Sequence, residues 1–77
     1  MSKTLFFHNK IKIKTVSKEL SKSFKFDYRF EFKKNMYLEN QKYLIVISKH
    51  FIRVLVFNGD DIQDLEKIKK EIYNINQ

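Results

Sequence analysis

Aromatic side chains occupy every even-numbered position from Phe24 to Phe32, and charged residues stand between them, Lys25, Asp27, Arg29 and Glu31. A strict period of two is typical of a β-strand that buries one face and exposes the other. The pattern therefore predicts a strand over residues 24–32. We expect its aromatic row to lie in the core and its charged row to lie in solvent.

The size of the chain limits what can stabilise it. It has 77 residues, no proline, one glycine and no cysteine. This length predicts a single small domain over residues 1–77 with one modest core. Without cysteine there is neither a disulfide nor a thiolate metal site, so dense packing and oligomerisation are the remaining sources of stability. The most apolar stretch, residues 43–57, is shorter than the roughly 20 residues of a membrane span. We expect a soluble, cytoplasmic protein.

Two further runs predict a hairpin. Residues 43–47 and residues 51–57 are rich in β-branched and aromatic residues, and Ser48, Lys49 and His50 connect them. In residues 43–47 both the odd-numbered and the even-numbered positions are apolar, which predicts a central strand that is covered on both faces. One helix covers only one face of a small sheet, so the second face would need a short helix, a partner or a second copy of the chain.

The apolar residues near the carboxyl end of the chain recur at helical spacing, which predicts a C-terminal helix. They are Ile62, Leu65, Ile68, Ile72 and Ile75. We expect this helix to lie over the aromatic row. Residues 5–16 alternate in a way that predicts one or two short strands, and residues 17–23 fit either a short helix or a loop. The predicted class is α+β: an antiparallel sheet of three to five strands packed on a C-terminal helix, with a short helix near residues 17–23.

Positive charge is concentrated in the first two thirds of the chain. Residues 1–53 carry thirteen Lys and Arg against four acids, whereas residues 54–77 carry three against five, which gives the net charge of +7. On the predicted strand, Lys10, Lys12 and Lys14 would project from one side at intervals of about 7 Å. Such a row suits the phosphate backbone of a nucleic acid. The candidate nucleic-acid-binding residues are Lys10, Lys12, Lys14, Lys18, Lys22 and Arg29.

Two other interpretations of the lysines stay open. Lysines protect an edge strand against aggregation, and a chain rich in Lys, Asn and Ile is also what AT-rich coding produces. The aromatic row itself could be a platform for stacking bases. In the predicted strand, however, the charges lie on the face opposite the rings, so the core interpretation is favoured.

Only one weak pattern for metal binding is present: Asp60, Asp61 and Asp64 fit the aspartate-rich motif with which prenyl-transferring enzymes hold magnesium, but acids also suit the start of a helix, and this interpretation is favoured. His8 and His50 are the only histidines, and neither has a metal-ligand spacing. No nucleophile elbow, phosphate loop or carboxylate pair is present. We therefore expect no enzymatic activity, no cofactor, no bound metal and no small-molecule substrate.

The order of the predicted elements resembles three layouts. Three strands followed directly by a helix resemble the single-strand DNA binders of the transcriptional-coactivator type and the arm-binding domains of integrases. With a helix at residues 17–23, the order resembles double-stranded-RNA-binding domains, although acids stand where that family has basic residues at the start of its last helix. No motif of these families is matched residue for residue, so the resemblance implies no site residues.

The sequence thus favours a small, basic, non-enzymatic binding protein. Its expected partner is nucleic acid or a complex that handles nucleic acid. By analogy, such proteins are common among the regulators and inhibitors of phages and mobile elements, anti-CRISPR proteins included. The alternative is a protein-interaction module or a homodimer with no nucleic-acid role, and no membrane partner is expected.

Overall fold

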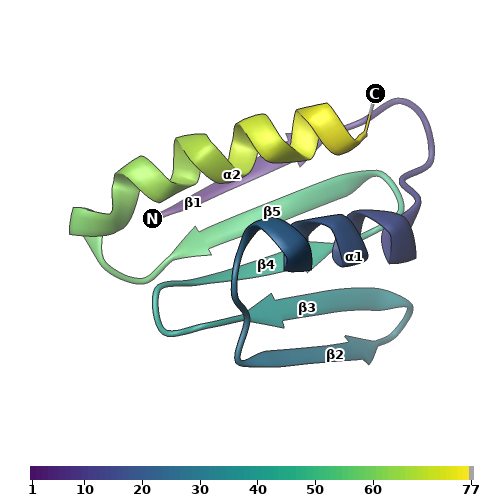
Figure 1. Cartoon of the computed structure of the whole chain (residues 1–77). Helices are drawn as coiled ribbons and strands as arrows, with labels where there is room; N and C mark the ends of the chain where they lie inside the picture. Colours follow the sequence, from purple (N-terminus) through teal and green to yellow (C-terminus); the bar gives the residue numbers. More distant parts are fainter. Residues whose placement is uncertain (77) are drawn as a thin grey trace.

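The computed structural model describes residues 1–76, with the backbone alone for Asp60. In this part of the chain the elements are β1 (Ser2–Phe6), α1 (Ile13–Ser23), β2 (Tyr28–Phe32), β3 (Asn35–Glu39), β4 (Tyr43–Ile47), β5 (Phe51–Val56), the 3-10 turn η1 (Gly59–Asp61) and α2 (Ile62–Ile75). The strands form one antiparallel sheet in the order β1-β5-β4-β3-β2 (Figure 1). The predicted α+β class, the antiparallel sheet and both helices are confirmed.

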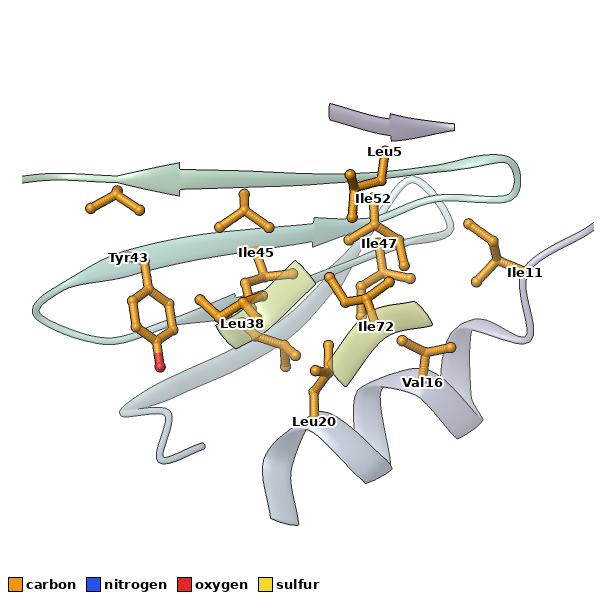
Figure 2. Close-up of a cluster of buried hydrophobic side chains, with 13 residues drawn as sticks. Leu5, Ile11, Val16, Leu20, Leu38, Tyr43, Ile45, Ile47, Ile52 and Ile72 are labelled. Carbon is orange, nitrogen blue, oxygen red and sulfur yellow. The ribbon is translucent and has the colours of Figure 1, made fainter. Parts of the chain in front are cut away.

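Both helices lie on the same face of the sheet (Figure 1). Helix α1 packs on β3 and β4, α2 packs on β5, and the two helices contact each other. Figure 2 shows Val16 and Leu20 of α1 pointing toward the sheet, where Leu38 and Ile45 lie. The buried apolar side chains are Leu5, Ile11, Val16, Leu20, Leu38, Tyr43, Ile45, Ile47, Ile52, Val54, Val56, Ile68 and Ile72. The core therefore lies entirely between the sheet and the helices.

The lysine-bearing strand does not form, so that prediction was wrong: Lys10 lies in the β1–α1 connection, Lys12 is the N-cap of α1 and Lys14 lies in its first turn. The alternation of Lys10, Lys12 and Lys14 fits a strand over a few residues, but the apolar residues from Ile13 onward recur at spacings of three and four. Val16 and Leu20 are buried on this stripe, together with Ser17. The helix predicted at residues 17–23 is confirmed, but it begins earlier, at Ile13.

The aromatic row does not form one strand, and this prediction was also wrong. The chain turns between Phe26 and Tyr28, so β2 contains only the second half of the row. Phe24 and Phe26 precede the strand and pack against the edge of the core, each at nearly a right angle to the ring of Tyr43. All residues of β2 are exposed, because this strand lies at the edge of the sheet beyond the reach of both helices.

The position of α2 and the cover of β4 also differ from the prediction. Helix α2 packs on β5, and strands β4 and β3 separate β5 from β2 at the edge of the sheet. Helix α2 therefore does not cover the aromatic row. Strand β4 is central as predicted, but only one of its faces is covered. Leu44 and Val46 point to the other face and are half-buried, because neighbouring side chains of the sheet shield them.

A two-residue turn joins β2 to β3. Phe32 pairs with Asn35 across a hairpin, so Leu38 faces the core although it has the same even parity as the exposed rings of β2. Lys33 and Lys34 form the turn with φ angles of 50° and 66°, in the left-handed region. Such turns favour Asn-Gly or Asp-Gly, and the pair Lys-Lys gives no turn signal. The sequence therefore does not predict this hairpin.

Candidate nucleic-acid interface

The face of the sheet opposite the helices, here called the open face, is lined by aromatic and aliphatic side chains. Along each strand, the residues that alternate with the core residues point to it. They include Phe6, Tyr28, Phe30, Phe32, Tyr37, Leu44, Val46, Phe51, Arg53 and Leu55. Phe6, Tyr28, Phe30 and Phe32 are 76%, 66%, 49% and 55% exposed. Large exposed rings gathered on one face are typical of a binding surface rather than of a chance distribution.

Cross-strand pairing places the rings of the open face side by side. Phe30 lies opposite Tyr37, and their rings are parallel within 1° with centroids 4.9 Å apart. Phe6 lies opposite Phe51, with centroids 6.4 Å apart. Because the pleat of a sheet holds these side chains at fixed spacing, the open face is a broad platform on which further planar groups can stack.

The charge on the open face is sparse and mostly positive. Arg53 is exposed on β5, between Thr4 of β1 and Val46 of β4. The ammonium group of Lys33 lies 5.5 Å from the centroid of the Phe32 ring. One acid, Glu39, is half-buried on β3. A ring platform with cations beside it suits a planar, anionic ligand.

Positive charge gathers at the end of the sheet where β1, β2 and β4 finish, on the right in Figure 1. A hollow of about 540 Å³ opens there, and no acid lines it. Its basic residues come from three separate connections of the fold: Lys10, Lys33, Lys34, Lys49 and His50. We call this the basic hollow. Phe51 and Asn35 also line it, so it adjoins the open face directly.

Backbone hydrogen bonds fix the connections that form the basic hollow. The amide of Phe7 donates to the carbonyl of His50 over 2.8 Å, and the amide of Ile11 donates to the carbonyl of Lys49 over 2.6 Å. These bonds attach the β1–α1 connection, which carries Lys10, to the β4–β5 turn. The cations are therefore held together by the fold and do not meet by side-chain flexibility alone.

One polar side chain at the hollow has no partner. Ser48 lines the basic hollow and is 5% exposed, and its Oγ makes no hydrogen bond. Buried hydroxyl groups are normally hydrogen-bonded, because leaving one unpaired costs about 1–3 kcal/mol. A ligand oxygen in the hollow would give this hydroxyl an acceptor.

Most of the lysines are not neutralised by ion pairs. Among the side chains that the structure describes, two ion pairs form, Lys22 with Glu19 at 3.4 Å and Lys42 with Asp64 at 4.0 Å. Both lysines are exposed and their acidic partners are at least partly open to solvent, where such pairs contribute little to stability. The cations of the basic hollow are in neither pair, so their charge is available to an anion.

The residues predicted to bind nucleic acid fall into three places. Lys10, Lys12 and Lys14 lie close together with Lys34 around a second hollow of about 370 Å³, beside the basic hollow. Lys18 and Lys22 continue along the exposed side of α1, away from it. Arg29 lies elsewhere, in a shallow hollow near the end of α1 that also contains Asp27. The predicted stripe is therefore not one surface.

The sequence reasoning missed Lys33, Lys34 and Lys49 as parts of a site, and it assigned the exposed rings to the core. The one usable signal was the break in alternation at Lys33 and Lys34, where the pattern of β2 stops before that of β3 begins. Nothing in the sequence indicates that the hydroxyl of Ser48 is buried without a hydrogen-bond partner.

Comparisons with known proteins identify no family, because no family model, curated protein or solved structure matches the chain. Within residues 1–76, no helix is long and apolar enough to cross a membrane. In the same part of the chain, no group of three or more His, Cys, Asp or Glu side chains is placed to hold a metal ion.

Proposed function

We propose that this chain is a non-enzymatic protein that binds single-stranded nucleic acid across the open face of its sheet. The observation that carries the proposal is the combination of exposed rings on the open face with a cluster of unpaired cations at its end. Aromatic side chains stack on unpaired bases, and lysines attract the phosphates between them. A duplex hides the faces of its bases, so the platform favours single strands.

The composition of the cations favours binding with little sequence preference. Fourteen of the sixteen basic residues are lysine, and Arg29 and Arg53 are the only arginines. Arginine is the side chain that reads guanine with two hydrogen bonds, and lysine acts mainly as a point charge. A small protein that covers a strand in this way fits a regulatory or inhibitory role, which is the role that the analogy with small basic phage proteins also favours.

The first test is a salt series of binding to labelled oligonucleotides of about 12 nucleotides, a length within the usual site size of such surfaces. We expect the affinity for single-stranded DNA or RNA to exceed the affinity for the matching duplex. It should fall steeply between about 50 and 200 mM salt, because counterions are released from the phosphates. Absence of binding at low salt, or a preference for the duplex, would refute the proposal.

Single substitutions then locate the interface. Phe30→Ala and Phe32→Ala should each weaken binding by about 1–3 kcal/mol, the usual contribution of one stacked base. The matched control is Tyr73→Ala, because Tyr73 is also an exposed ring (43%) but lies on α2, in the other layer. If Tyr73→Ala weakens binding as much as Phe30→Ala does, the open face is not the interface.

A second candidate function rests on the edge strand. Every residue of β2 is exposed, and one side of its backbone has no neighbouring strand. Such an edge can pair with another chain, and the open face could bury its rings in a homodimer. Light scattering on the free protein distinguishes the two functions. A dimer whose mass falls when Phe30 is replaced favours self-association, whereas a monomer that binds oligonucleotides favours the nucleic-acid interface.

A further inference from the structure

We infer that the basic hollow is a specific site for a phosphate monoester, the doubly charged group at the end of a nucleic-acid strand. This inference rests on the proposed function, because it makes the hollow the place where a strand on the open face ends. The geometry that links the two is the shared residue Phe51, which packs beside Phe6 on the open face, with the two rings tilted by 49°, and also lines the hollow.

The charge in the hollow exceeds what one backbone phosphate requires. Four lysines and a histidine line it without an acid, whereas an internal phosphodiester carries a single negative charge. A terminal monoester carries nearly two charges at neutral pH and has three acceptor oxygens. The cations of the hollow therefore match the terminal phosphate of a strand better than an internal phosphodiester.

The buried hydroxyl of Ser48 supplies a second, independent indication of a ligand. It is a donor with no acceptor in the protein, and it lies among cations. The Oγ is itself shielded from solvent, so the side chain must rotate toward the hollow before a phosphate oxygen can accept its proton in a charge-assisted hydrogen bond, which is shorter and stronger than one between neutral groups.

The backbone of the β2–β3 turn is a further feature of the hollow. Lys33 and Lys34 both adopt left-handed torsions that side chains resist and that Asn-Gly would adopt at less cost. Unfavourable torsions are concentrated at functional sites, where the surrounding structure holds them. The two-residue hairpin itself requires these torsions, and it carries two lysines to the hollow at positions where Asn-Gly would fit the backbone better.

The start of α1 adds to the positive potential. Lys12 is the N-cap residue of α1, no side chain caps the helix, and its first turn contains no acid. The positive end of the helix dipole is therefore not neutralised, and Lys12 and Lys14 increase the local charge. Lys10 and Ile13 line the basic hollow, which places this end of α1 beside it.

The test compares oligonucleotides of one sequence that differ only in their ends: a 5′-phosphate, a 3′-phosphate, or hydroxyl groups at both ends. We expect one phosphorylated end to tighten binding about tenfold, a factor that corresponds to 1.4 kcal/mol. Ser48→Ala should abolish this preference and leave the affinity for the hydroxyl-ended strand within about twofold. Lys33→Asn combined with Lys34→Gly should also abolish the preference, but it should weaken the binding of every strand, because both lysines belong to the proposed interface. Lys67→Ala combined with Lys70→Ala is the control, because it removes the same charge from the exposed side of α2.

The outcomes separate this inference from the proposed function. If hydroxyl-ended and phosphorylated strands bind equally well, the strand-end site is wrong and the open-face interface stands. If no strand binds, the proposed function fails, and the hollow is judged by titrating inorganic phosphate and a mononucleotide while the amide signals of Ser48, Lys49 and His50 are followed by NMR. Saturable shifts that Ser48→Ala removes support a phosphate site filled by free phosphate or nucleotide, and unmoved signals overturn it.

Discussion

The ring of Phe30 on β2 stacks on the ring of Tyr37 on β3, parallel within 1° and with centroids 4.9 Å apart. This pair lies on the open face, where each ring keeps contact with water. We expect a coupling energy of about 0.5–1 kcal/mol between the two side chains, as for other cross-strand aromatic pairs. A double-mutant cycle with Phe30→Ala and Tyr37→Ala, read by urea unfolding, measures it. A coupling near zero would mean that the rings do not stack in solution.

Two leucines on neighbouring strands test the one-sided core. Leu38 on β3 is fully buried under the helices, whereas Leu44 on β4 is half-buried on the open face. Leu38→Ala should lower the free energy of unfolding by about 2–5 kcal/mol, because it leaves a cavity, and Leu44→Ala should cost about 1 kcal/mol. Denaturant unfolding of the two variants gives the comparison. Equal losses would indicate that a partner or a second copy covers the open face.

The β2–β3 turn should become more stable when its lysines are replaced. Lys33→Asn combined with Lys34→Gly relieves two left-handed torsions and should raise the free energy of unfolding by about 1–2 kcal/mol. The control is Lys33→Gln combined with Lys34→Gln, which removes the same charge and keeps the unfavourable torsions. If the Gln variant is stabilised as much as the Asn-Gly variant, then charge repulsion rather than backbone strain sets the cost.

Ser48 should oppose folding in the absence of a ligand. Its buried Oγ has no hydrogen-bond partner, so Ser48→Ala removes an unsatisfied group. We expect the variant to gain about 1 kcal/mol in phosphate-free buffer, measured by thermal or denaturant unfolding. A loss of stability would show instead that the hydroxyl bonds within the protein.

Stability above pH 10 should depend on Tyr43. Burial raises the pKa of its hydroxyl above the usual value of 10.0, and the charge of Asp64 adds to the rise, while a hydrogen bond with Asn40 opposes it. Because the folded state holds this proton more tightly, the contribution to stability is complete below the unfolded-state pKa and is lost as the pH rises through the folded-state pKa.

Tyr43→Phe cannot lose this proton, so it provides the comparison. The difference in unfolding free energy between the wild type and the variant should be constant between about pH 7 and pH 9, and it should shift in favour of the variant above about pH 10. Urea unfolding across this range gives both curves. Parallel curves up to about pH 11 would mean that Tyr43 titrates as it does in the unfolded chain.

The sequence predicted the elements whose pattern is long or whose turn chemistry is ordinary. Helix α2 follows from its isoleucine stripe, and β4 and β5 follow from their apolar runs. The turn before Tyr43 was also predictable, because Asn40 is a turn residue. In the structure its Oδ1 accepts hydrogen bonds from the amides of Lys42 and Tyr43.

The misassigned rings have one physical cause: a period of two says that a strand has two unlike faces, but not which face the core covers. The rings of Phe30 and Phe32 were assigned to the core because burial is their commonest fate. The sheet order puts β2 at the edge, and both helices lie elsewhere, which only tertiary packing decides. The basic hollow was hidden for a related reason, since three connections far apart in the sequence form it.

Because α1 and α2 share one side of the sheet, the buried core residues and the exposed rings of the open face form two separate sets. Changes among the exposed rings and turn lysines leave the packed layer intact. The side chains of the open face can therefore diverge while the packed layer beneath them stays the same, which would let related chains differ in what the proposed interface binds.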